Sequence, residues 1–467
     1  NIQKTFFPVK LLKMCYTIAK HSDWNYDFMK TIGIIAEYNP FHNGHAYQIK
    51  KIKEETHADY VVIAMSGDFV QRGAPAIADK YCRTAMALSC GADAVFELPV
   101  LWAVSSAEDF AMAGVTMFDK MSCIDGICFG AETSDLKLLS SIADFFATEP
   151  EDYQELLSSY IKEGMTFPAA RAKALLSLFP DPSVEPLLNT PNNILAFEYL
   201  KAIRRRHSSL TPYPLKREGA GYHDTRIQTG SQDGEKKGSD IPTASATAIR
   251  ALLSDSDLDF QTLAGTMPER ALALLQEYLA TSPVVTTDAF SSILGYQLLS
   301  MEKEELEQIY DITPDIANRI YKNRYEFHSF TQFCELNKSR DITYTRMSRI
   351  LLHTILHITK EMYLVQKETD YIPYLRLLGF RKDATPFLSE LKKKTSIPLL
   401  SRLSDAKKLL SEQPDFYCCT AALDLLQKDL FAADLYEQVK AACSKNAVSI
   451  SEYSRKIILN DGINGFR

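Results

Sequence analysis

The sequence predicts an α/β fold: a doubly wound domain built on a parallel sheet, followed by a mainly helical C-terminal domain. Short apolar runs alternate with longer helical stretches from residue 31 onward, and this alternation is typical of βαβ units. The spacing between the runs suits right-handed crossover connections. After Arg250 the strand pattern gives way to amphipathic helices, which indicates a second domain.

The predicted strands are short and apolar, as expected for strands covered on both faces of a parallel sheet. They comprise residues 31–36, 60–65, 92–98 and 126–130. Helices are expected between them, over 45–57, 76–90 and 105–119. Farther along, the pattern predicts helices over 134–207, a strand over 213–217, a polar loop over 225–240, helices up to residue 365, and a mixed α/β tail.

From these elements we predict that the chain is divided into three parts. Residues 1–28 form an N-terminal extension, 29–252 the α/β domain, and 253–467 the helical domain with its α/β tail. No run of about 18 apolar residues occurs, so we expect no membrane-spanning helix. Lysines interrupt the short apolar pieces of the first 30 residues, so we expect no secretory leader.

The charge balance and the cysteines exclude other classes of protein. Lys+Arg 52 and Asp+Glu 59 leave a formal net charge of −7, so only local patches could bind a nucleic acid. The nine cysteines include the neighbours Cys418 and Cys419 and no Cys-x-x-Cys pair. This pattern favours reduced thiols in a cytoplasmic protein over disulfides or a zinc site, and we expect no metal bound by the protein alone.

Residues 36–45 follow the first predicted strand and open the first helix, where open α/β sheets bind ligands. They contain His42, Gly44 and His45. A helix N-terminus offers unpaired N–H groups to a phosphate, and Gly44 lets that phosphate approach the backbone. The two imidazoles can donate to α- and β-phosphate oxygens. Two nearby histidines can be a coincidence, but this placement favours a phosphate site.

Residues 243–250 form a helix start that is rich in Ser and Thr and ends in Arg250. The hydroxyls of Ser245 and Thr247, with Arg250 one turn in, can hold the β- and γ-phosphates of a nucleotide. An ordinary N-cap is the alternative for this element alone. Together with the first motif, it favours the phosphate interpretation, with catalytic roles for His42, His45 and Arg250.

The helical domain carries a local excess of basic residues between positions 319 and 360, with aromatic residues interleaved. Such a patch can contact a nucleic-acid backbone, whereas a solvated helix face is the alternative. Arg346 and Arg349 share one helix face, three residues apart. The residues expected to contact RNA are Lys338, Arg340, Arg346 and Arg349.

The spacing His-x-Gly-His and the Ser/Thr-rich helix start resemble the nucleotidylyltransferase superfamily. From residue 29 to beyond 400, the chain resembles more closely the bacterial tRNA(Met) cytidine acetate ligase family. The segments that carry this resemblance are Glu37 to His45, Met65 to Gly73, Gly91 to Pro99, Phe129 to Glu132, Pro191 to Asn193, Lys216 to Asp224 and Lys338 to Arg346.

This resemblance implies a Rossmann-like nucleotidylyltransferase domain of the HUP type that uses ATP, with Mg²⁺. It implies an enzyme that activates acetate as acetyl-adenylate, releases pyrophosphate and acetylates N4 of the wobble cytidine in the anticodon loop of elongator tRNA(Met). Besides Ser245 and Thr247, the expected ATP-binding residues are Ile35, Ala36, Glu37, Tyr38, Asn39, Pro40, Phe41, Asn43, Gly44, Gln48, Gly130, Asn192, Asn193 and Arg217.

Further residues are candidates for the acetate pocket. Ser66, Gly67 and Asp68 follow the second strand, where substrate-binding residues collect. His223 precedes Asp224, which could orient its ring. A plain turn is the alternative for both segments.

Other polar residues favour structural roles. Asp93 and Glu97 lie in a strand and need partners, for which Arg72 or Arg83 is as good a candidate as a metal. A packed helix face explains His353 and His357 better than metal binding, because no third ligand is evident.

Two other functions remain open at this point. A small-molecule adenylyltransferase would join ATP to a phosphorylated metabolite and would not need the basic C-terminal region. A non-catalytic tRNA-binding protein that senses nucleotide would keep nucleotide binding without His42 and His45. Retention of both histidines, Gly44 and the Ser/Thr–Arg element argues against a decayed site.

Overall fold

The computed structural model describes residues 29–179, 184–188, 190–216, 245–254, 260–412, 415–444 and 448–462. The predicted extension 1–28 and the predicted loop 225–240 lie outside these ranges. None of the described helices has the length and apolar composition needed to cross a membrane.

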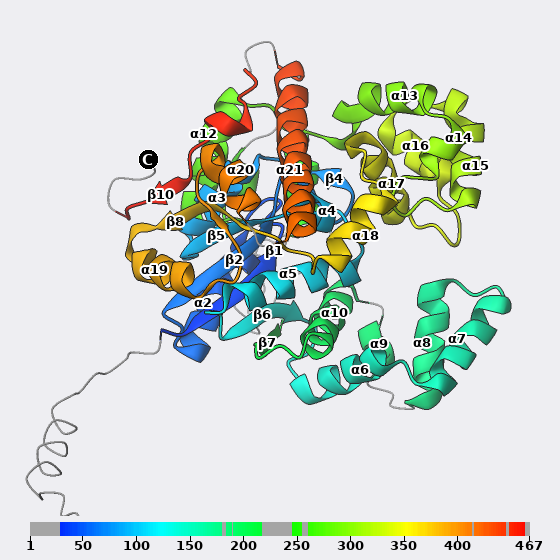
Figure 1. Ribbon diagram of the computed structural model, residues 1–467, viewed down its shortest axis with the longest axis horizontal. Helices are drawn as coiled ribbons and strands as arrows, with labels where there is room; N and C mark the ends of the chain where they lie inside the picture. Colours follow the sequence, from blue (N-terminus) through cyan, green and yellow to red (C-terminus); the bar gives the residue numbers. More distant parts are fainter. Residues whose placement is uncertain are drawn as a thin grey trace, which may run out of the picture.

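An eight-stranded sheet forms the centre of the molecule (Figure 1). Its strand order is β10-β8-β5-β2-β1-β6-β7, and β9 pairs with β8. The predicted strands are confirmed as β1 (Thr31–Ala36), β2 (Tyr60–Ser66), β5 (Ala94–Leu98), β6 (Gly126–Ala131) and β7 (Thr211–Lys216), all parallel. The chain adds β2 on one side of β1 and β6 on the other. The carboxyl end of β1 is therefore a topological switch point, where α/β sheets bind ligands.

Helices cover both faces of this sheet, as the predicted doubly wound fold requires. The predicted first helix is α2 (Asn43–Thr56), and the third is α5 (Ala107–Met121), preceded by α4 (Val100–Ala103). The second, predicted from residue 76, starts later as α3 (Lys80–Ser89). A hairpin of β3 (Phe69–Val70) and β4 (Ala74–Pro75) occupies the preceding segment, and Asp79 caps α3 by accepting from Cys82 N.

The region 134–207 is helical, as predicted. It contains α6 (Leu136–Thr148), α7 (Glu151–Lys162), α8 (Phe167–Leu178), α9 (Glu185–Leu188) and α10 (Pro191–Arg205). Helix α10 packs against α5 and α6. The α7–α8 pair projects from the body of the molecule (Figure 1).

The chain after residue 245 is mainly helical up to residue 368. It contains α11 (Ala246–Leu253), η1 (Phe260–Leu263), α12 (Glu269–Thr281), η2 (Thr287–Phe290), α13 (Ser291–Ser300), α14 (Lys303–Leu306), α15 (Pro314–Asn323), η3 (Arg324–Glu326), α16 (Phe330–Asn337), α17 (Tyr344–Leu356) and α18 (Lys360–Glu368). The tail adds β8 (Leu375–Arg381), η4 (Lys382–Ala384), α19 (Thr385–Lys394), β9 (Leu399–Leu400), α20 (Leu403–Ser411), α21 (Phe416–Ala442), η5 (Glu452–Ser454) and β10 (Ile458–Asn460).

The mixed α/β tail returns to the sheet of the first domain. Strand β8 pairs antiparallel with β5, and β10 pairs parallel with β8. The tail is predicted to belong to the C-terminal domain, whereas in the structure its strands cover the exposed edge of β5. An uncovered edge of a buried apolar strand would leave its backbone groups unpaired. The boundary at residue 253 stays a prediction.

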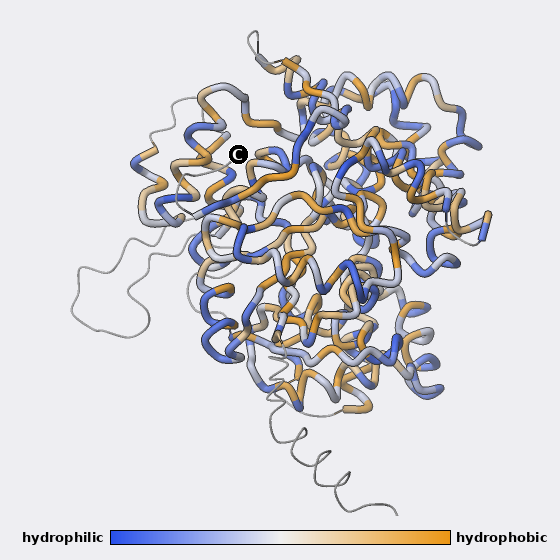
Figure 2. The backbone as a smooth tube through the Cα atoms, turned by 60° about the vertical axis from the view of Figure 1, so that its left-hand side comes forward, coloured by the Kyte–Doolittle hydropathy of each residue, from blue (hydrophilic) through white to orange (hydrophobic). Residues whose placement is uncertain are grey.

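Two apolar clusters fill the two sides of the sheet, because successive strand side chains point to opposite faces. Ile32, Ile34 and Ile63 belong to the cluster with α2, α3 and α12. Val62 and Phe96 belong to the cluster with α5, α10 and the C-terminal helices. The hydropathy-coloured tube shows the central strands as largely apolar and many outer helices as hydrophilic (Figure 2).

A fully buried ion cluster joins the tail to the first domain. Lys80 Nζ lies 2.8 Å from Oε1 of Glu97 and 2.8 Å from Oε1 of Glu452, and 3.5 Å from Oδ2 of Asp68. Arg376 contacts Oε2 of Glu97 at 2.9 Å and also contacts Glu452. Removing one member would strand a buried charge, which is far more costly than losing a surface pair.

Asp93 and Glu97 have cationic partners, as predicted, but these partners are not the predicted arginines. Glu97 pairs with Lys80 and Arg376, and Asp93 pairs with Lys53 at 2.6 Å, not with Arg72 or Arg83. No group of three or more metal-ligating side chains occurs among the described residues. The need for buried partners is visible in sequence, but their identity depends on how distant segments pack.

Asp68→Asn tests the electrostatics of this cluster. Burial raises the pKa of Asp68 to about 6, against the opposing effect of Lys80. Ionising Asp68 thus costs extra free energy only in the folded state. The unfolding free energy of the wild-type protein therefore declines, relative to that of the variant, as pH rises from about 4 to about 6. Relative to wild type, the variant should gain roughly 2–3 kcal/mol of unfolding free energy between pH 4 and pH 7. Urea unfolding at several pH values measures this difference, and a constant difference would contradict the assignment.

Candidate functional site

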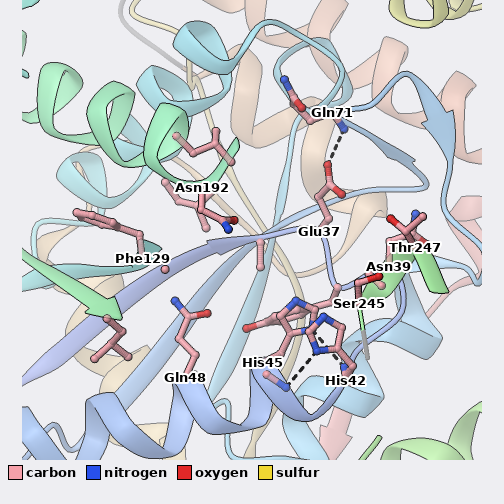
Figure 3. Close-up of a pocket in the computed structure, with 18 of the residues that line it drawn as sticks. Glu37, Asn39, His42, His45, Gln48, Gln71, Phe129, Asn192, Ser245 and Thr247 are labelled. Carbon is pink, nitrogen blue, oxygen red and sulfur yellow. Dashed lines mark hydrogen bonds between the residues drawn. The ribbon is translucent and has the colours of Figure 1, made fainter. Parts of the chain in front are cut away.

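A cavity of about 280 Å³ opens at the carboxyl end of β1 (Figure 3). Its walls come from the β1–α2 turn, α2, the ends of β6 and β7, the start of α5, α10, the start of α11 and the turn after β3. It brings together both phosphate motifs predicted from sequence, which lie about 200 residues apart along the chain. The predicted residues in its lining are Ile35, Ala36, Glu37, Tyr38, Asn39, His42, Gly44, His45, Gln48, Gly130, Asn192, Ser245, Thr247 and Arg250.

The two histidines form a stacked pair at the start of α2. Their ring centroids are 3.7 Å apart, with planes inclined by 23°. His42 is the N-cap, and its Nδ1 accepts from Gly44 N at 3.1 Å, whereas His45 Nδ1 accepts from His42 N at 3.2 Å. An acceptor nitrogen carries no proton, so the proton of each neutral ring sits on Nε2. The backbone contacts thereby make Nε2 the donor that each ring can offer to a ligand oxygen.

Aromatic packing fixes the orientation of His45. Its ring lies 4.7 Å from the centroid of Tyr38 and 5.5 Å from that of Phe41, both of which are buried. Phe41 does not line the cavity but supports the residues that do. This packing places the His45 ring before any ligand arrives, which lowers the cost of ordering it on binding.

The start of α11 faces the start of α2 across the cavity. Ser245 caps α11 by accepting from Ala248 N at 3.1 Å. Arg250 donates to the carbonyl oxygen of Asn39 at 2.6 Å and to Oγ1 of Thr247 at 3.1 Å. Burial, followed by the charge of nearby Arg72, lowers the pKa of Arg250 to about 10. Two cations, the N-terminus of α11 and the two imidazoles at the start of α2 thus converge on one space, which suits a polyanion.

A third wall is the turn that carries Gln71 and Arg72. Gln71 N donates to Oε1 of Glu37 at 2.9 Å (Figure 3). Gln71 Nε2 donates to the carbonyl oxygen of Ser105 at 3.3 Å. On the other side, Ser348 Oγ of α17 donates to the carbonyl oxygen of Gly73 at 2.8 Å. The turn is therefore held between the β1–α2 turn and the helical region.

The far end of the cavity has the predicted polar residues of α10 and β6. Asn192 Nδ2 donates to Oε1 of Glu132 at 2.8 Å, and Gln48 Nε2 donates to the carbonyl oxygen of Cys128 at 3.4 Å. The backbone of Gly130 lines the same end. Asn193 instead is fully buried, where its Oδ1 accepts from Glu132 N at 2.9 Å. Asn192 faces the cavity, and Asn193 orients the neighbouring loop.

Several predicted residues lie elsewhere. Pro40 and Asn43 do not line the cavity, and Asn43 N donates to the carbonyl oxygen of Thr266 at 3.1 Å. Arg217 and His223 lie outside the described residues. The roles assigned to Arg217 and His223 therefore stay predictions.

Ser66, Gly67 and Asp68 are not part of the cavity wall, contrary to the acetate pocket expected there. Arg83 donates to the carbonyl oxygens of Ser66, at 3.1 Å, and of Gly67, and Asp68 belongs to the buried ion cluster. The β3–β4 hairpin continues from this segment and carries the chain back to the cavity at Gln71. A position after the end of a strand does predict residues near the cavity. Because the β3–β4 hairpin follows β2, however, the residues that reach the cavity are Gln71 and Arg72 and not Ser66, Gly67 and Asp68.

Several lining residues are not among those predicted from the sequence. They are Tyr47, Gln71, Arg72, Phe110, Phe129, Leu195, Tyr199, Leu215, Lys216 and Ala246. Arg72 lies within Met65 to Gly73, a segment that resembles the family, and it follows soon after the end of β2. Both features could have indicated that it lies near the cavity. Phe110 and Tyr199 carry no such signal, because apolar residues inside a helix indicate core packing.

The predicted RNA-binding residues differ in their surroundings. Lys338 and Arg340 are exposed, and Lys338 forms an ion pair with Glu335. Arg346 is half-buried and contacts Asp311 at 2.7 Å, while the backbone of Arg349 abuts Gly73. Lys338 and Arg340 are therefore available to a large ligand, whereas Arg346 and Arg349 also hold the helical region together.

The histidines of α17 have no metal-site geometry. His353 is fully buried between the carbonyl oxygens of Val104, 2.9 Å from Nε2, and Tyr310, 3.2 Å from Nδ1. Burial lowers its pKa to about 4. His357 ends the helix in the left-handed conformation. The packed helix face expected from sequence matches His353, whereas His357 is exposed at the C-cap.

Comparisons with known proteins agree with this geometry. Residues 29–449 match the family model HIGH Nucleotidyl Transferase. A tRNA(Met) cytidine acetate ligase of Thermoanaerobacter sp. is 39% identical over 87% of this chain and 95% of its own length. The protein of that name from Acetivibrio thermocellus is 35% identical over 92% of this chain and 100% of its own.

Solved structures match over the same extent. Thermotoga maritima TmcAL in its apo form superposes with a TM-score of 0.83 at 28% identity, covering 93% of this chain and 100% of that one. The same protein bound with alpha-thio ATP superposes with a TM-score of 0.83 at 26% identity. The fold class predicted from sequence is confirmed, and the chain belongs to the tRNA(Met) cytidine acetate ligase family of HIGH nucleotidyl transferases.

Proposed function

We propose that this protein uses ATP to activate acetate as acetyl-adenylate and then acetylates N4 of the wobble cytidine of elongator tRNA(Met). The observation that carries this proposal is the cavity in which His42 and His45 of one helix start face Arg250 of another. The family of the chain and the alpha-thio ATP complex of its structural relative support ATP as the ligand of that cavity.

The residues suit the first step. Acetate is already ionised at neutral pH, because the pKa of a small carboxylic acid is about 4 to 5, so it needs no general base. One acetate oxygen attacks the α-phosphorus, the bond from that phosphorus to the bridging oxygen breaks, and pyrophosphate leaves. The charge that builds on the phosphates would be met by Nε2–H of His42 and His45, by Arg250 and by the N-terminus of α11.

Acetyl-adenylate supplies the activation that the second step requires. The N4 amine of cytosine is a weak nucleophile, since its lone pair is delocalised into the ring. N4 attacks the acyl carbon, the bond from that carbon to the phosphate oxygen breaks, AMP leaves, and N4 loses a proton to solvent. The base can reach the cavity only from an unpaired loop, such as an anticodon loop.

Mg²⁺ fits this proposal as a counter-ion of the triphosphate. No cluster of three metal-ligating side chains exists in the described ranges, so phosphate oxygens and water would supply most ligands, as Mg²⁺ prefers. When bound, the ion would neutralise charge on the leaving pyrophosphate. The protein residues would still orient the α-phosphate.

The central experiment is incubation with ATP, Mg²⁺ and isotopically labelled acetate, with and without unmodified elongator tRNA(Met). We expect label in N4-acetylcytidine, measured by nucleoside mass spectrometry, only when the tRNA is present. Pyrophosphate release without labelled RNA would redirect the search for the acceptor. No reaction in either sample would favour a metabolite adenylyltransferase or a non-catalytic binder.

His45→Ala removes one donor from the α-phosphate region. Loss of a single well-placed donor lowers turnover by roughly 10²–10³-fold, so acetate-dependent pyrophosphate release should fall by that factor. The affinity for tRNA should stay unchanged. His57→Ala is the matched control, because His57 is exposed at the opposite end of the same helix. Equal losses in both variants would contradict the role of His45.

The double substitution of Lys338 and Arg340 by Ala tests the RNA-binding surface. Both side chains are exposed, so tRNA affinity should weaken and the slope of log Kd against log salt should change by roughly 2. Acetate activation without RNA should be unaffected. Substituting Lys407 and Lys408 of α20, which are also exposed, provides the control. A loss of activation with intact tRNA binding would reverse the proposed division of roles.

A further inference from the structure

We infer that Arg72 and Phe110 form the subsite for the small carboxylate that attacks ATP. This inference rests on the proposed function and replaces the pocket expected at Ser66, Gly67 and Asp68. Both side chains line the cavity. Arg72 is half-buried and Phe110 is 3% exposed, so an anion there would meet a guanidinium and an apolar ring in a largely dry space.

The wall that carries Arg72 and Phe110 is separate from the two helix starts and is available to the nucleophile. His42, His45 and Arg250 lie at the two helix starts, where a triphosphate binds. In-line displacement requires the attacking oxygen to approach the α-phosphorus from the side opposite the leaving pyrophosphate. Arg72 and Lys216 line the cavity from walls other than the two helix starts, and of these two cations Arg72 is half-buried whereas Lys216, at the end of β7, is exposed.

A hydrogen bond links the turn that carries Arg72 to the segment just before the helix that carries Phe110. Gln71, next to Arg72, donates to the carbonyl oxygen of Ser105 at 3.3 Å. Ser105 precedes α5, whose first turns carry Asp109 and Phe110. Asp109 accepts from the hydroxyls of Tyr310, at 3.0 Å, and Tyr363. The arginine turn is therefore bonded to the segment before α5, and the start of α5 is bonded to the helical region.

The chemistry of the pair suits acetate. A guanidinium can bind both oxygens of a carboxylate through two parallel hydrogen bonds, which would aim one oxygen at phosphorus. The ring of Phe110 would contact the methyl group and limit the length of the acyl chain. Such size selection by an apolar wall is worth about 1–3 kcal/mol per methylene.

The turn that carries Arg72 also contacts the helical region. Gly73 has φ 77°, and a Cβ at this position would collide with the backbone of Arg349 in α17. Ser348 of the same helix donates to the Gly73 carbonyl oxygen. The carboxylate subsite thus lies at the junction between the nucleotide cavity and the helix that carries Arg346 and Arg349.

Acetate-dependent exchange of labelled pyrophosphate into ATP, with and without tRNA, tests the subsite in the full-length protein. Arg72→Met should raise the KM for acetate by roughly 10–100-fold, the value of a charge-assisted hydrogen bond, and change the Kd for ATP less than about threefold. Arg72→Lys should recover part of the loss, and added guanidinium should partly rescue Arg72→Ala. The control is Arg402→Met, because Arg402 is exposed and outside the cavity.

Phe110→Ala provides a second measurement that loss of folding would not mimic. The enlarged pocket should raise the ratio of kcat/KM for propionate to that for acetate by about 10-fold. An unchanged KM for acetate in Arg72→Met, or an equal rise in the Kd for ATP, would overturn the subsite. Absence of acetate-dependent exchange in wild type, with ATP still bound, would instead refute the proposed function and the subsite with it.

Discussion

Two buried cations, Lys80 and Arg376, hold the carboxylates of Glu97 and Glu452 in the interior. These groups come from α3, β5, β8 and η5, so they meet only when the C-terminal tail has returned to the sheet. Each charge alone would carry a large desolvation cost, which makes the cluster an all-or-none contact. The same cluster holds Asp68 at the end of β2, from which the hairpin and the Arg72 turn extend. The geometry of one cavity wall therefore depends on a contact more than 350 residues away in sequence.

The cavity owes its chemistry to the central position of β1. Because β2 and β6 flank this strand, its carboxyl end is open, and α2 starts there. Helix α11 then brings a second N-terminus to the same space, with Arg250 bound to the carbonyl oxygen of Asn39. The stacked histidines and the nearby Arg72 add donors without adding a nucleophile. Such a site can stabilise a transferring phosphoryl group, whereas the attacking group must come from the substrate.

The helical region is joined to this cavity through packed, polar contacts. Ser348 binds the turn at Gly73, Tyr310 binds Asp109, and His353 lies against the carbonyl oxygen of Val104. All three contacts reach segments that border the Arg72 turn or the start of α5. A tRNA held by the helical region would thus bind next to the place where the activated acyl group forms. Short transfer distance protects an acyl-adenylate from water, because the intermediate does not need to leave the cavity.

Much of this protein follows from local sequence. Apolar runs and spacing determine the five parallel strands and the helices between them, since these patterns reflect burial of each segment on its own. The His42–His45 motif and the Arg250 element are recognisable because a helix start must present particular residues to a phosphate. Their convergence, the position of Arg72 in the cavity wall, and the partners of Glu97 and Asp93 were decided by tertiary structure. Such contacts join residues far apart in the chain, and no local pattern records which distant side chain will neutralise a buried charge.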